Sequence, residues 1–411
     1  MKLFVREFLP VLSVVLAGVM LLSVVSCSKD EPEQPESRSV LVYVAAQNSL
    51  VSNLNNDVVE MLAGVSGMGE NDHLMLFVDD NNNSRIYEIT RSTNARNLYN
   101  MTPVYKFDKN LNAATPAVLD QVLRYFFQHY KATDYGLVMW SHGSGWINAT
   151  NRVQQNHDVA SRRAFAVDTS DGSTRMLITD MASVLSRYPK FEYILFDACF
   201  MQTIEVLYEL RAGAKYIIGS PAEIPGAGAP YQQMIPALFK RASSDKVAES
   251  IVNVYGSYYN NSTISNANGV VLSAVKTDQM DAFVSVMSHL FATYHFLDES
   301  KYTNCLNYYP YEWNYLGAAF ISPDSYDIKG IIKAVVTDRD DYQQWETALS
   351  QLSPYTSIGR SWYSGYTRNF QLVDAEQCGA ISMYLPLEKY KNDNYFDFYG
   401  EIQWGKLFEI K

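Results

Sequence analysis

The stretch "FEYILFDAC" (191–199) is the part of the sequence that decides the fold. Its apolar run ends in an acid, a small residue and a thiol, and a helical segment at 201–211 and a second apolar run at 215–221 follow it. A short apolar strand, a helix and another short apolar strand are typical of a parallel sheet. The sequence therefore predicts a β-α-β unit in which Cys199 stands where a buried strand ends.

The same alternation extends upstream of this unit. Further strand-like runs lie at 39–46, 73–80, 135–146 and 164–168, and helical segments at about 114–131 and 179–188. Thr115 and Pro116 form a good N-cap and first-turn pair for the earlier of these helices. The pattern indicates an α/β fold around a mostly parallel sheet. Ligands bind such sheets beyond the carboxyl ends of the strands.

The part of the chain after about residue 245 is less regular. Helices are expected at 245–258, 277–295 and 327–349, and strands near 365–373 and 378–385. The many tyrosines of this region suit the packing of amphipathic rings at a subdomain surface. We predict a main α/β domain at 39–275 and a C-terminal α+β subdomain at 276–411 packed on it.

The first 27 residues have the composition of an export signal. A short basic region precedes an apolar stretch from Phe8 to Val25, and "VVSC" ends at Cys27. This resembles a lipobox, which implies that Cys27 is lipidated and anchors the exported protein to the outer membrane, facing the periplasm or the cell surface. An ordinary signal peptide or a plain membrane anchor is the alternative. The polar run at 28–38 is expected to be a solvated tether.

Charge and cysteine content restrict the partners of the protein. The chain has 33 Lys and Arg against 44 Asp and Glu, a net charge of −11. An acidic chain without Lys/Arg clusters is a poor candidate for binding nucleic acid or anionic lipid. A structural metal is not indicated, because no His/Cys cluster has zinc-ligand spacing, and we expect no cofactor, with a calcium requirement left open. We also expect a monomer.

Three cysteines remain if Cys27 is acylated, so not all of them can pair. A disulfide between Cys305 and Cys378 with Cys199 left free, and two buried thiols in its place, are both compatible with the sequence.

The segment "MWSHGSGW" (139–146) carries a second candidate group. His142 follows an apolar strand and lies in a glycine-bearing turn. Imidazole exchanges a proton near neutral pH, and Gly143 leaves a backbone N–H open to a substrate carbonyl. A histidine that merely caps a turn is the alternative.

Cys199 gains significance from this histidine. A thiolate attacks amide carbonyls well when a base helps it to ionise, and a helix that starts near Met201 would lower the thiol pKa. His142 precedes Cys199 by 57 residues, and in caspases a histidine lies roughly fifty residues upstream of the cysteine. A core cysteine is the alternative, but the pairing with His142 favours a catalytic dyad.

Four segments in order resemble successive blocks of the clostripain family of cysteine peptidases, which belongs to the caspase-like clan. They are "YVAAQNSL" (43–50), "SHGSGW" (141–146), "FDACFMQTIEVLYELR" (196–211) and "SPAEIPGAGAPY" (220–231). The resemblance implies a caspase-like α/β/α sandwich with a C-terminal α+β extension. It also implies a cysteine endopeptidase that acts on protein or peptide substrates.

Roles for single residues follow from this resemblance. His142 would be the general base and acid, Cys199 the nucleophile, and the N–H groups of Gly143 and Cys199 the oxyanion hole. Asp197 matches a carboxylate that selects Arg or Lys, which is reasonable because a guanidinium pairs with a buried carboxylate in a bidentate manner. An acid satisfied by backbone N–H groups at a strand end is the alternative for Asp197.

Self-cleavage after a basic residue is also implied, between the His and Cys segments. The candidate positions are Arg152, Arg162 and Arg163 in the polar stretch 148–163, and an uncut surface loop is the alternative.

The sequence departs from the family pattern at two places. Gln47 stands where the family usually has Asp, and Ala229 where it has an aromatic residue; Glu223 is the candidate for a second pocket acid. A binding lipoprotein that keeps the fold without turnover is therefore a competing hypothesis. The same dyad with a preference for small residues or Asn is a third.

Overall fold

The computed structural model describes residues 37–92, 99–146, 165–170, 174–261, 269–309, 312–315, 318–321, 324–365, 367–391 and 394–408. These residues belong to one compact unit, 35–411. The expected signal peptide with Cys27, and most of the tether, lie outside the described residues. Within the described ranges, none of the helices combines the length and the apolar character that crossing a membrane requires.

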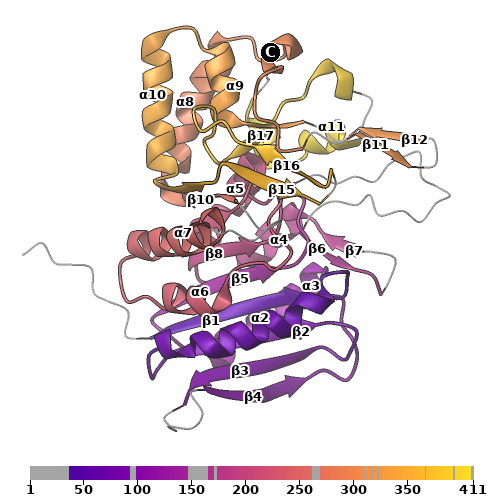
Figure 1. Ribbon diagram of the computed structural model, residues 1–411, viewed down its shortest axis with the longest axis vertical. Helices are drawn as coiled ribbons and strands as arrows, with labels where there is room; N and C mark the ends of the chain where they lie inside the picture. The colour runs from indigo at the N-terminus through magenta and orange to yellow at the C-terminus, as the bar shows by residue number, and fades with distance from the viewer. Residues whose placement is uncertain are drawn as a thin grey trace, which may run out of the picture. The chain divides into compact units, whose positions relative to one another are not determined.

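Nine strands form the main sheet, in the order β14-β10-β9-β8-β5-β1-β2-β3-β4 (Figure 1). The central strands are parallel to one another: β1 (Arg38–Ala45), β2 (His73–Asp79), β5 (Asp134–Trp140), β8 (Phe191–Asp197) and β9 (Ala214–Gly219). Antiparallel strands extend both edges: β3 (Arg85–Arg91), β4 (Tyr99–Lys106), β10 (Val271–Lys276) and β14 (Tyr355–Ile358). The predicted parallel core is thus confirmed.

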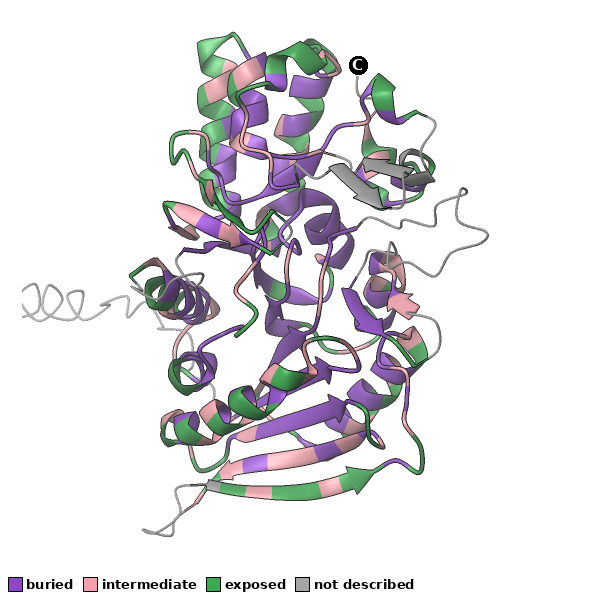
Figure 2. Ribbon diagram, turned by 45° about the vertical axis from the view of Figure 1, so that its right-hand side comes forward, coloured by how far each residue is buried: buried purple, intermediate pink, exposed green. Residues whose placement is uncertain are grey.

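Helices cover both faces of this sheet. On one face lie α2 (Val51–Gly64), α6 (Tyr231–Leu238) and α7 (Ser244–Asn260), and on the other α3 (Pro116–His129), α4 (Ile178–Leu185) and α5 (Ile204–Leu210). Val40, Val42 and Val44 of β1 pack into the first core, whereas Leu41 and Tyr43 pack into the second. The central strands are continuous apolar runs because both of their faces are buried (Figure 2).

Side-chain caps mark the starts of several helices. The Thr115 hydroxyl accepts a hydrogen bond from the Val118 N–H, and Pro116 opens α3 as predicted. The start expected near Met201 is wrong, because Thr203 caps α5 by accepting from the Val206 N–H, so α5 begins at Ile204. The single helix expected at 327–349 is also wrong. Asp338 caps a new helix there, which divides the segment in two.

The remaining elements lie in smaller units. The helices are α8 (Met280–Thr293), α9 (Ile328–Val335), α10 (Arg339–Leu352), α11 (Asn394–Tyr399) and α12 (Gln403–Leu407). The two-stranded sheets pair β6 (Phe165–Asp168) with β7 (Thr174–Met176), β11 (Glu312–Tyr315) with β12 (Ala318–Ile321), β13 (Ser325–Asp327) with β17 (Ser382–Tyr384), and β15 (Ser361–Ser364) with β16 (Asn369–Leu372). Helices α8, α9 and α10 lie together near β10 (Figure 1).

The C-terminal part of the chain pairs with and packs against the N-terminal part. Strand β14 completes the main sheet beside β10, and the Ser382 N–H donates to the Gln202 carbonyl at 3.0 Å, just beyond the nucleophile segment. The part of the chain after residue 276 thus contacts the main sheet and the segment that follows Cys199.

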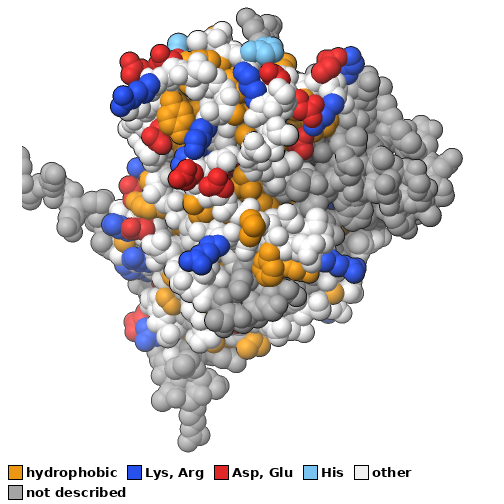
Figure 3. Space-filling view, turned by 45° about the horizontal axis from the view of Figure 1, so that its top comes forward, with side chains coloured by type: hydrophobic (Ala, Val, Ile, Leu, Met, Phe, Trp, Pro, Cys, Tyr) orange, Lys and Arg blue, Asp and Glu red, His pale blue; other side chains and the backbone are white. Residues whose placement is uncertain are grey.

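Basic and acidic side chains are interspersed on the face of the molecule shown in Figure 3. Alternating signs lower the electrostatic field that such a face presents to a charged partner.

Candidate active site

Cys199 lies in a tight turn directly after β8. The next residue, Phe200, has φ +61°, a left-handed conformation that non-glycine residues rarely adopt. Two contacts hold it there: the Phe200 N–H donates to the Ala222 carbonyl at 3.0 Å, and its ring packs on Tyr309 with centroids 4.4 Å apart. Strain of this kind persists where the surrounding structure fixes it and is frequent at active sites. The turn leaves the Cys199 side chain half-buried.

The environment of Cys199 favours the neutral thiol. Burial raises the pKa of this thiol to about 12, and the charges of Glu223 and Asp197 act in the same direction. The Ile224 N–H, which lies 3.4 Å from Sγ, opposes the shift. The predicted lowering of the thiol pKa by a helix dipole is thus wrong for the resting protein, since α5 begins only at Ile204.

His142 is held at the end of β5 by its neighbours. The Ser141 hydroxyl donates to the Ala45 carbonyl at 2.8 Å, and the Ala166 N–H donates to the His142 carbonyl at 3.0 Å. Burial lowers the pKa of His142 to about 4, and the positive charge of Arg175 acts in the same direction. The imidazole is therefore neutral at pH 7 and able to accept a proton.

The sheet register brings the two predicted groups to the same edge. Trp140 pairs with Asp197 in the parallel β5–β8 ladder, so His142 and Cys199 each stand two residues beyond a matched pair. Their loops are in contact, because a Cβ on Gly143 would lie 2.4 Å from the Cys199 carbonyl oxygen. Only a glycine allows this approach, as the sequence suggested for Gly143.

Ser49 is a site residue that the sequence did not reveal. Its Oγ lies 2.9 Å from Nε2 of His142. An imidazole that carries its proton on Nε2 would donate to Ser49 and leave Nδ1 free to accept the thiol proton. The signal that could have identified Ser49 is its place shortly after β1, whose carboxyl end lies beside that of β5.

Replacing Ser49 by alanine is expected to lower kcat/KM about fivefold, because one hydrogen bond of about 1 kcal/mol no longer orients the imidazole. Peptidase assays across pH 4 to 9 check this. The acid limb of the profile should move in Ser49→Ala and return in Ser49→Thr, which retains the hydroxyl. An unchanged rate and profile in Ser49→Ala would show that Ser49 does not position His142.

Asp197 is buried, with 3% of its surface exposed, on the face of the sheet covered by α6 and α7. Each carboxylate oxygen accepts two hydrogen bonds: both accept from the Ala229 N–H at 3.0 Å, and they accept from the Tyr231 and Tyr255 hydroxyls at 2.8 and 3.0 Å, respectively. Burial raises the pKa of Asp197 against the effect of these donors. Of the two interpretations of this residue, the geometry matches the acid that its neighbours satisfy.

The other positions singled out in the sequence have structural partners. The Glu223 carboxylate accepts from the Gly365 N–H at 2.9 Å and so fixes the β15–β16 turn. The Gln47 carbonyl accepts from the Thr169 N–H at 3.0 Å. Cys305 and Cys378 are free thiols, one of the two states that the sequence left open.

Two further predictions concern other parts of the chain. Arg152, Arg162 and Arg163 lie outside the described residues. Within the described ranges, no group of three or more His, Cys, Asp or Glu side chains could hold a metal ion.

Known proteins are similar to this chain over much of its length. The family model of the clostripain family matches residues 42–410. Clostripain of Hathewaya histolytica is 25% identical over 236 residues, which are 50% of this chain and 43% of that protein, so the match spans less than half of this curated relative.

Solved structures match over nearly the whole chain. A secreted C11 cysteine protease from Bacteroides thetaiotaomicron in complex with an irreversible peptide inhibitor is 28% identical, with a TM-score of 0.76 over 90% of this chain and 98% of that one. An inactive zymogen C11 protease from Parabacteroides distasonis is 25% identical, with a TM-score of 0.70 over 90% and 97%.

Proposed function

The chain belongs to the clostripain family of C11 cysteine peptidases, and from this membership we propose that it is a cysteine endopeptidase in which His142 and Cys199 form the catalytic dyad. The observation that carries the proposal is the register of β5 and β8, which places both residues two positions beyond a paired Trp140 and Asp197.

The chemistry begins from a neutral pair. His142 removes the Sγ proton as the thiol attacks the substrate carbonyl carbon, and the oxyanion that forms accepts hydrogen bonds from the N–H groups of Gly143 and Cys199. The protonated imidazole then donates its proton to the leaving amine, and the acyl group remains on sulfur as a thioester. Water, deprotonated by His142, hydrolyses the thioester and restores the thiol.

We extend the proposal to substrates cut after Arg or Lys, which the resemblance of Asp197 to a family pocket residue first suggested. The same dyad with non-basic specificity is the second candidate, and the full pairing of the Asp197 carboxylate favours it. The first candidate requires an acidic side chain that pairs with the Arg or Lys of the substrate, and the second does not. Identifying such a side chain would therefore decide between the two specificities.

Two further parts of the proposal concern processing and location. Self-cleavage at Arg152, Arg162 or Arg163 is supported by the position of these residues between the His and Cys segments. Export is supported by the N-terminal sequence and by the Bacteroides thetaiotaomicron relative that is described as secreted, and lipid anchoring through Cys27 by the N-terminal sequence.

Labelling with a peptidyl chloromethyl ketone under reducing conditions tests the dyad. The protein should gain the mass of one peptidyl group on Cys199, whereas Cys199→Ala should gain none. Cys305→Ala and Cys378→Ala are the matched controls and should label like the parent protein. Absence of both labelling and peptide hydrolysis in the parent would favour the binding lipoprotein, and labelling that persists in Cys199→Ala would reject Cys199 as the nucleophile.

A further inference from the structure

Two aromatic rings lie against the nucleophile turn and form a small core of their own. The rings of Phe200 and Tyr309 have centroids 4.4 Å apart, the two residues are 3% and 2% exposed, and the half-buried Cys199 packs against them. Neither ring belongs to the two large cores on the faces of the main sheet. Tyr309 follows Phe200 by 109 residues, so a segment of the C-terminal part of the chain reaches the active site at this point.

The backbone of Phe200 joins the two catalytic loops. Its N–H donates to the Ala222 carbonyl at 3.0 Å, and a Cβ on Gly145 would lie 3.1 Å from its carbonyl oxygen, so the histidine loop packs against the same residue. The φ of +61° is unfavourable for a residue with a Cβ and persists only where outside contacts fix it. Because Phe200 directly follows Cys199, a movement of Phe200 would also move the thiol relative to His142.

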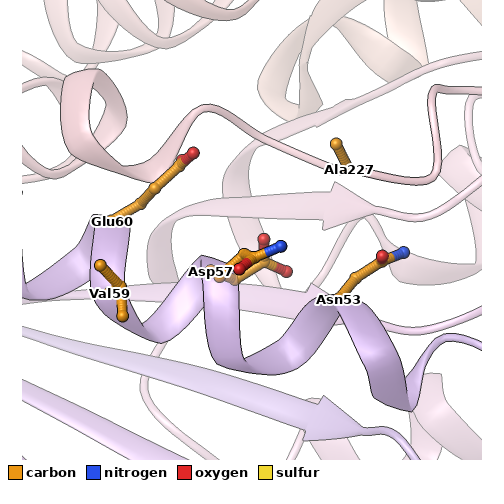
Figure 4. Close-up of a pocket in the computed structure, with 6 residues that line it drawn as sticks. Asn53, Asp57, Val59, Glu60 and Ala227 are labelled. Carbon is orange, nitrogen blue, oxygen red and sulfur yellow. The ribbon is translucent and has the colours of Figure 1, made fainter.

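The main-chain acceptor of this turn is supported from the side of α2. Asn53 of α2 donates to the carbonyl of Gly226, in the segment that continues from Ala222. Figure 4 shows Asn53 facing this segment, and the two border a cavity of about 310 Å³. The main-chain contact of the turn thus comes from the α/β part of the chain, whereas the contact of the Phe200 ring comes from Tyr309.

Tyr309 is held in place by contacts that do not involve Phe200. The Tyr309 N–H donates to Oδ1 of Asn307 at 3.0 Å, and the Ser325 N–H donates to the same oxygen at 3.1 Å. Nδ2 of Asn307 in turn donates to Oδ1 of Asp324 at 2.6 Å. The Tyr309 ring can therefore act as a fixed support for the ring of Phe200.

Simple filling of space is the alternative role for this pair. Two packed rings are favourable wherever they lie, and in that role they would contribute only to the stability of the fold. The place of the pair favours a second role, because the ring contact acts on the strained residue that follows the nucleophile. A displacement of about 1 Å at a reacting atom can cost about 10²-fold in rate.

We propose that Tyr309 is a positioning residue: its ring holds Phe200 in the left-handed turn and so sets the place of Cys199 relative to His142. The inference rests on the proposed endopeptidase activity. Because Tyr309 acts through Phe200, its loss should slow the chemical step and leave substrate binding largely unchanged. The activity of the dyad then depends on a segment of the C-terminal part of the chain as well as on the main sheet.

Steady-state kinetics on one fluorogenic peptide and the rate of alkylation by iodoacetamide test the proposal. Iodoacetamide is small and needs no substrate pocket, so its rate on Cys199, assigned by mass spectrometry, reports on the thiol and His142. The variants are Tyr309→Ala and Tyr309→Phe, which keeps the ring. Tyr302→Ala is the matched control, because Tyr302 is also 2% exposed and packs on Tyr326 with centroids 5.4 Å apart, but belongs to a large core.

Tyr309→Ala is expected to lose about 100-fold in kcat and in the alkylation rate, with KM within about threefold of the parent value. Tyr309→Phe should stay within about twofold of the parent in all three quantities, since the ring contact remains. Tyr302→Ala should lower the melting temperature and leave kcat unchanged. If Tyr309→Ala does not fold, Tyr309→Leu fills most of the space without a ring and should lose about tenfold in kcat.

Phe200→Gly tests whether Tyr309 acts through Phe200. Glycine adopts a φ of +61° without strain, so the turn no longer needs the ring contact. Tyr309→Ala should therefore cost less than about threefold in kcat in the Phe200→Gly protein, against about 100-fold in the parent. An equal cost in both proteins would show that Tyr309 acts by another route.

Other results would also contradict the assignment. A folded Tyr309→Ala variant with the parent kcat and alkylation rate would leave the pair as packing alone. A raised KM with an unchanged alkylation rate would make Tyr309 a substrate-binding residue, and an equal loss of kcat in Tyr302→Ala would indicate general destabilisation. If the parent shows no Cys199-dependent hydrolysis, the endopeptidase itself is rejected, whereas the alkylation rates still show whether Tyr309 positions the thiol.

Discussion

The His142→Ala variant is expected to lose about 10³–10⁴-fold in kcat/KM, the upper range for removal of a general acid–base. The reason is the raised pKa of the Cys199 thiol. Burial raises the pKa of Cys199 to about 12, so little thiolate exists at pH 7 until a base removes the proton. The same imidazole must later protonate the leaving amine.

Kinetic comparison of three variants checks this expectation. His142→Ala, Cys199→Ala and the double variant should have nearly equal residual rates, because residues that act as one unit are not additive. His289→Ala, which changes a histidine of α8 on the surface, is the control and should retain the parent rate. A double variant much slower than either single variant would show that the two residues act independently.

The pH dependence gives a second test of the same dyad. His142 accepts a proton only when it is neutral, and its pKa is lowered to about 4. Activity should therefore persist at pH 5.5 and fall only as the pH approaches 4, whereas an unperturbed histidine would lose it near 6.5. An acid limb centred near 6.5 would mean that the imidazole is better solvated, or paired with the thiolate, during turnover.

The position of His142 and Cys199 at one edge of the sheet could be predicted because it depends on short-range patterns. Each of the strands 135–140 and 191–197 is a continuous apolar run, and parallel neighbours in a sheet bring their carboxyl ends to the same edge. The position of His142 and Cys199 just past these runs therefore followed from the sequence. The role of Gly143 could be predicted as well, since a glycine after a strand allows another segment of backbone to approach closely.

The surroundings of the dyad could not be predicted, because they depend on contacts between distant segments. Ser49 reaches His142 across 93 positions, and Asn53 meets Gly226 across 173. No short sequence pattern indicates that residues so far apart in the chain are in contact. The role assigned to Asp197 shows the same limit. Its place two residues before Cys199 suggested a pocket, which stays a prediction, and the donation from Tyr231 and Tyr255 of two later helices to its oxygens could not be predicted.

Asp197→Ala is expected to lower the free energy of unfolding by about 3–5 kcal/mol. The change leaves the Ala229 N–H and the hydroxyls of Tyr231 and Tyr255 without their acceptor in a buried site, and each orphaned group costs about 1–3 kcal/mol. Some of this loss is recovered if water enters the space that the carboxylate leaves.

Thermal and urea denaturation of Asp197→Ala, Asp197→Asn and the exposed control Glu70→Ala measure this effect. Asp197→Asn should lose less stability than Asp197→Ala, because its amide oxygen still accepts from two of the three donors, and Glu70→Ala should unfold like the parent. The rates on two peptides that carry arginine or citrulline, its uncharged analogue, before the cut then separate a structural role of Asp197 from a role in specificity. If Asp197 only holds the segment 228–231 in place, Asp197→Asn lowers stability and leaves the ratio of the two rates unchanged. A stable Asp197→Asn variant with a collapsed ratio would show the reverse.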